Sequence, residues 1–144
     1  MDPFFVIFTI VFCGTLLLLT MLRCIRKKKL LKSLVEVEDD EFVEVFLENF
    51  YAPKDYVIAQ RHKLARQLWV PVNILAPDFK FGVLEDCWIL KSDGETSEFL
   101  IELLSDHLSK YIESPLYGEE LNIETVSEYI YYSAIRDGVI LIFR

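Results

Sequence analysis

The feature that most constrains this chain is an uncharged apolar run near its start. Residues 4–22 read FFVIFTIVFCGTLLLLTML. In a helix that rises 1.5 Å per residue, such a run is about as long as the hydrocarbon core of a bilayer is thick, roughly 30 Å. One isolated segment cannot close a barrel, so in hydrocarbon it satisfies its backbone hydrogen bonds only as a helix. The run therefore predicts a membrane-spanning helix that tethers the rest of the chain.

Basic residues follow the apolar run directly and predict its orientation. Asp2 precedes the run, and six bases follow it: Arg23, Arg26, Lys27, Lys28, Lys29 and Lys32. A cleaved signal peptide has its positive charge before the apolar region, which is the opposite order. By the positive-inside rule we expect a single-pass protein with its N-terminus outside and its C-terminal domain cytosolic, at the inner membrane if the source is bacterial. A stop-transfer signal explains the bases, which could also bind anionic head groups at the membrane surface.

The remaining residues, 34–144, are enough for one compact domain and are strongly acidic. They carry a net charge of −13, from 22 acidic and 9 basic residues, whereas residues 1–33 carry +5. Such a domain repels nucleic acid and favours a basic protein surface as its partner. The three cysteines and two histidines match no zinc site and no disulfide framework, so we expect no metal site.

The hydrophobic pattern of residues 34–144 predicts a mainly α-helical domain. Apolar residues recur at helical spacing over residues 39–50, 56–68, 96–112 and 123–135. Asp39 or Asp40 is expected to cap the first of these helices. Thr125 and Glu128 have the spacing of a capping box at the start of the last.

The segments between and after these helices are also expected to be ordered. Residues 72–84 predict a long loop pinned by its apolar side chains, and residues 139–143 predict a short terminal strand. We expect Arg61 to face solvent, on the side of its helix opposite the apolar residues. Trp69 and Trp88 are expected in the core, where tryptophan is highly buried on average, and an interface is the alternative.

Over about residues 57–137, the order of parts resembles the acyl carrier protein superfamily. Those domains have a helix, a long loop, a second helix that begins at a serine bearing 4'-phosphopantetheine, and a last helix opened by Thr-Val. With Ser97 in the place of that serine, Glu102 and Leu103 fall on the family's Glu-Leu pair. Thr125 then falls at the start of the last helix. The resemblance implies a small acyl-carrier-like helical bundle behind the membrane anchor of residues 1–33.

The residues around the serine depart from the family's pattern. The family has Asp-Ser-Leu where this chain has Thr96-Ser97-Glu98, and residues 87–95 are inserted just before it. The resemblance therefore implies the fold more than the chemistry. Ser97 has two interpretations: a phosphopantetheine attachment site at a helix N-terminus, or a residue that caps the helix.

Acidic residues recur every fourth position along residues 96–112, at Glu98, Glu102 and Asp106. The resemblance implies that they form a docking stripe for a basic partner, and a solvated helix face is the alternative. Phe99 and Leu103 are expected on the buried side of the same helix.

The chain has no Ser-His-Asp set, no HExxH and no glycine-rich phosphate loop, so we do not expect an enzyme. We expect a membrane-anchored, acyl-carrier-like interaction domain. An unrelated small membrane adaptor or immunity-type protein is the alternative.

Overall fold

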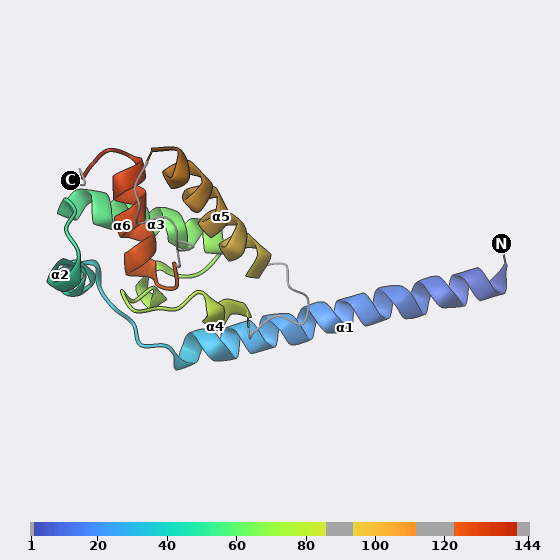
Figure 1. Ribbon diagram of the computed structural model, residues 1–144. Helices are drawn as coiled ribbons and strands as arrows, with labels where there is room; N and C mark the ends of the chain where they lie inside the picture. Colours follow the sequence, from blue (N-terminus) through green and yellow to red (C-terminus); the bar gives the residue numbers. More distant parts are fainter. Residues whose placement is uncertain (1, 86–93, 112–122, 141–144) are drawn as a thin grey trace.

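The computed structural model describes residues 2–85, 94–111 and 123–140, and Figure 1 shows how its helices are arranged. Within these ranges there are six α-helices, one 3-10 turn and no strand. Their bounds are α1 (Pro3–Ser33), α2 (Asp39–Asn49), α3 (Lys54–Leu68), η1 (Val72–Ile74), α4 (Gly82–Glu85), α5 (Gly94–Tyr111) and α6 (Val126–Arg136). The expected mainly α-helical fold is confirmed for the described residues.

The first helix, α1, extends away from the other helices as a single rod (Figure 1). It begins where the Asp2 carboxylate accepts a hydrogen bond from the backbone N–H of Phe4, and it continues through the basic flank to Ser33. None of its residues is buried, and it is long and apolar enough to cross a membrane. An uncovered apolar surface of this size is typical of a helix that faces lipid.

The other long helices pack around one hydrophobic core. Helix α6 packs against both α3 and α5, and α2 packs against α3. Each large apolar side chain buried in this way contributes about 1.5–3 kcal/mol to folding. The largest fully buried apolar side chains are Phe42, Phe46, Val57, Leu64, Leu75, Leu84, Leu104, Leu108, Val126 and Ile130.

Residues 72–84, predicted as a loop, form an ordered connection that includes η1 and the start of α4. The four side chains that pin it are buried: Ile74, Leu75, Phe79 and Phe81. The loop also pairs with the start of α6, because Phe81 N donates to Glu124 O at 3.0 Å and Val126 N donates to Phe79 O at 3.1 Å. Residues 72–85 therefore hold α6 in place as well as connecting two helices.

The capping box predicted at the last helix is confirmed. The Thr125 hydroxyl accepts from Glu128 N at 3.3 Å, and the Glu128 carboxylate accepts from Thr125 N at 3.0 Å. After α6 the chain turns at Gly138, whose φ of +69° suits glycine. Val139 and Ile140 are not in a strand, and the remainder of the predicted terminal strand lies outside the described residues.

The predicted cap of α2 and the predicted burial of Trp69 were wrong. Helix α2 has Glu38 at its N-cap with no side-chain hydrogen bond, because the Asp39 side chain instead contacts α3 and Asp40 pairs with Lys54 at 2.7 Å. Trp69 is not in the core but 83% exposed, at the residue that ends α3. Trp88 lies outside the described residues.

Candidate functional site

A buried arginine joins the start of the domain to its core. Arg61 on α3 is 1% exposed, so the expectation that it faces solvent was wrong. Its guanidinium donates to Asp39 Oδ1 at 2.6 Å, to the carbonyl of Val37 at 2.6 Å and to the carbonyl of Leu75 at 3.1 Å. The guanidinium carbon also lies 4.5 Å from the centre of the Phe42 ring, within range of a cation–π contact.

The Asp39 carboxylate is held by two bases. His62 Nε2 lies 2.9 Å from the Asp39 oxygen that Arg61 does not contact. Burial alone would raise the pKa of Asp39, but hydrogen bonds from His62 and Arg61 outweigh it and lower the pKa from its usual 3.8. Burial lowers the pKa of Arg61, whose guanidinium nevertheless stays charged. We call Val37, Asp39, Arg61 and His62 the junction cluster, because it fixes the segment that leads from α1 into α2.

The six bases predicted to meet the membrane surface all lie on the C-terminal part of α1. Four are exposed (Arg26, Lys28, Lys29 and Lys32), and two are partly buried (Arg23 and Lys27). Lys27 Nζ donates to the carbonyl of Trp69 at 2.9 Å, and Leu31 and Leu34 pack against the domain core. The domain therefore lies alongside the basic end of α1 (Figure 1).

The acidic stripe lies on α5. Glu102 and Asp106 are exposed, whereas Leu104 and Leu108 on the opposite side of the helix are fully buried. Because α5 begins at Gly94, two residues before the expected start, the backbone of Ser97 lies inside the first turn and not at the N-cap position. The side chains of Ser97 and Glu98 lie outside the described part of the helix.

Two apolar side chains share the exposed face of α5 with these acids. Phe99 is 57% exposed and Leu103 is 51% exposed, so both were wrongly expected to be buried. Residues three and four positions apart are neighbours on a helix, which places Phe99, Glu102, Leu103 and Asp106 on one surface. We call these four residues the α5 face. Sequence reasoning identified its acids by their spacing and missed its apolar pair.

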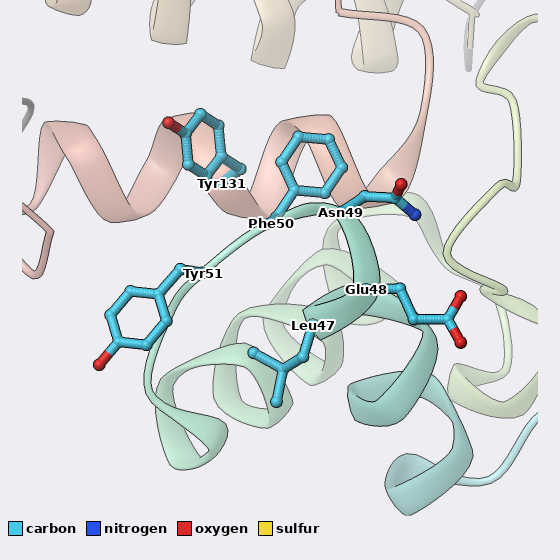
Figure 2. Close-up of a pocket in the computed structure, with 6 residues that line it drawn as sticks. All are labelled: Leu47, Glu48, Asn49, Phe50, Tyr51 and Tyr131. Carbon is cyan, nitrogen blue, oxygen red and sulfur yellow. The ribbon is translucent and has the colours of Figure 1, made fainter.

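A shallow hollow of about 430 Å³ lies between the end of α2 and α6 (Figure 2). Its lining consists of Leu47, Glu48, Asn49, Phe50, Tyr51 and Tyr131. The rings of Phe50 and Tyr131 lie 5.0 Å apart, whereas Tyr51 points away from them in Figure 2. One carboxylate among aromatic and amide groups provides no acid–base pair, so we assign no chemistry to this hollow.

Neither metal binding nor common descent is indicated by these findings. The described residues contain no group of three or more His, Cys, Asp and Glu side chains that could hold a metal ion. Comparison with family models, with characterised proteins and with solved structures found no significant match to this chain. The resemblance to acyl carrier proteins therefore stays a prediction from the sequence.

Proposed function

We propose that this protein is a single-pass membrane protein whose acidic cytosolic domain docks a basic partner protein through the α5 face. The observation that carries the proposal is the composition of that face. Two large apolar side chains, each more than half exposed, lie beside two exposed carboxylates on one side of the helix. Exposed apolar groups bordered by charge are characteristic of protein interaction sites.

Charge favours a basic partner. The domain carries −13, and the α5 face contributes Glu102 and Asp106 to its surface. A partner that surrounds an apolar patch with lysine or arginine would pair with these carboxylates and cover Phe99 and Leu103. Complementary charge of this kind raises the association rate and selects among partners more than it raises affinity.

Membrane attachment is supported by the composition and exposure of α1. Its apolar part has no buried residue in the described structure, and its bases all follow the apolar part. The positive-inside rule then puts the domain on the cytosolic side. A tethered domain meets membrane-bound partners at a high effective concentration, so a modest interface is enough for function.

Site-specific photo-crosslinking in host membranes tests the docking role. A photoreactive residue at Leu103 should capture one basic protein, whereas the same residue at Val45 on α2, which is 39% exposed, should not. The double variant Glu102→Lys with Asp106→Lys should abolish the capture. The matched control, Glu41→Lys with Glu44→Lys, makes the same charge change at exposed positions of α2 and should retain it. Identical products from both positions, or no effect of the α5 charge reversal, would contradict the proposal.

We further propose that docking does not need a phosphopantetheine arm. The support for this is the absence of the family's Asp-Ser-Leu motif around Ser97. The intact mass of protein purified from its own host should therefore match the unmodified chain. A gain equal to one phosphopantetheine arm, abolished by Ser97→Ala, would make the protein a carrier instead.

A further inference from the structure

We propose that Trp69 is a second membrane contact: its indole inserts among the lipid head groups beside α1 and holds the acidic domain against the bilayer. This inference rests on the proposed function, because it requires α1 to span that bilayer. The occupant of the Trp69 surface is then an anionic lipid surface and not a protein.

The local structure keeps the Trp69 ring outside the domain. Trp69 is 83% exposed, although Leu68 and Val70 on either side of it are buried. Its backbone has a φ of +56°, a left-handed conformation that is uncommon for residues other than glycine. Its N–H bonds to the last turn of α3, at Arg66 O. Because both neighbours are held in the core, the indole cannot turn inward without unfolding the end of α3.

A hydrogen bond gives the depth of Trp69 relative to the bilayer. Its carbonyl accepts from Lys27 Nζ at 2.9 Å. Lys27 follows the last residue of the apolar run, Leu22, by five positions, which is about 7.5 Å along a helix. The head-group layer on each side of a bilayer is roughly 5–8 Å thick. Trp69 therefore lies at the level of the head groups, where tryptophan is enriched in membrane proteins.

The charges near Trp69 favour an anionic partner over a neutral or basic one, and the head-group depth of Trp69 makes that partner lipid. Arg66, one turn earlier on α3, is exposed, and so are Arg26, Lys28 and Lys29 on α1. An aromatic ring among bases is the usual composition of a surface that binds anionic head groups. The α5 face carries the opposite charge and would be repelled by the same lipids. The two surfaces therefore serve different partners, lipid at Trp69 and protein at α5.

Fluorescence of the full-length protein in vesicles tests this contact. The vesicles contain phosphatidylcholine and phosphatidylglycerol, with bromine on the acyl chains near the head groups as a quencher. The chain has two tryptophans, Trp69 and Trp88, so the difference between the wild type and Trp69→Phe isolates the emission of Trp69. We expect this emission to be blue-shifted, quenched by the brominated lipid and protected from acrylamide in the water.

A matched control places a tryptophan at another exposed position. Tyr51, between α2 and α3, is 74% exposed. In the Trp69→Phe background, Tyr51→Trp should add emission that acrylamide quenches and brominated lipid does not. If Trp69 behaves like this control, the inference is wrong.

Flotation of the vesicles after an alkaline wash separates the two possible failures. If the protein floats with the vesicles and Trp69 stays in water, the lipid contact alone is contradicted. If the protein does not float, α1 does not span the bilayer, and the proposed function fails with it.

Discussion

Arg61 illustrates how one buried side chain can join segments that are far apart in sequence. Its three hydrogen bonds reach Val37 before α2, Asp39 in the first turn of α2 and Leu75 after η1. Removing the guanidinium would leave two buried carbonyls without donors and the Asp39 carboxylate without one of its two hydrogen-bond partners. Each buried polar group left unpaired in this way costs about 1–3 kcal/mol.

We therefore expect Arg61→Met to lower the free energy of unfolding by at least about 3 kcal/mol. Chemical denaturation of the full chain in detergent micelles, followed by circular dichroism, measures this change. The matched control is Arg66→Met, an exposed arginine on the same helix, which should change stability by less than about 0.5 kcal/mol. Equal effects of the two substitutions would show that the Arg61 hydrogen bonds contribute nothing.

Two carboxylates, Asp39 and Asp137, are expected to make the stability of the domain depend on pH. The pKa of Asp39 is lowered by its hydrogen bonds from His62 and Arg61. The pKa of Asp137 is lowered mainly by a hydrogen bond from Arg136. The Tyr56 hydroxyl, which donates to Asp137 Oδ2 at 2.7 Å, lowers it further. An acidic group whose pKa is lower in the folded state than in the unfolded state stabilises the fold at pH values above its unfolded-state pKa. This stabilisation is lost as the pH falls through the folded-state pKa.

We therefore expect the free energy of unfolding to be level near neutral pH and to fall below about pH 4. Denaturation curves of the full chain at a series of pH values measure this dependence. Asp39→Asn with Asp137→Asn should be less stable at neutral pH and should lose less on acidification. An unchanged pH slope in the double variant would assign the acid sensitivity to other groups.

At the scale of elements, the capping box makes α6 the helix with the clearest local start signal. Thr125→Ala removes the hydroxyl that accepts from Glu128 N and should cost about 1 kcal/mol. Thr125→Ser keeps an accepting hydroxyl and should restore most of the loss. Thermal unfolding of the three proteins measures the difference, and equal midpoints for alanine and serine would contradict the role of the cap.

The elements also show which features sequence reasoning can predict. The helices and the capping box were predictable because their signals, a 3.6-residue period and a three-residue spacing, are local. Arg61 was not, because its partners lie 14 to 24 residues away in the chain.

The candidate sites show the same limit. The spacing of Glu102 and Asp106 indicated an exposed acidic stripe, but Phe99 and Leu103 were misplaced because their burial depends on which neighbours α5 meets. Trp69 was misplaced for the same reason. Composition favours a core position, and only the folded chain shows that both of its neighbours occupy the core instead.

At the scale of the whole molecule, charge and hydrophobicity are divided along the chain. An apolar helix is followed by bases and then by a domain of charge −13 (Figure 1). In the proposed topology, the bases would attract the anionic surface of the cytoplasmic leaflet, which the domain by itself would avoid. In the proposed function, this division would hold the acidic α5 face close to a membrane surface that the face itself does not bind.

Protease treatment of right-side-out membranes, washed with alkali and carrying the protein with a C-terminal tag, tests this arrangement most directly. We expect the tagged domain to stay with the membranes through the wash and to resist protease until the membranes are permeabilised. Release of the protein by the wash, or digestion of the domain by protease added to intact membranes, would contradict a membrane-spanning α1 with a cytosolic domain.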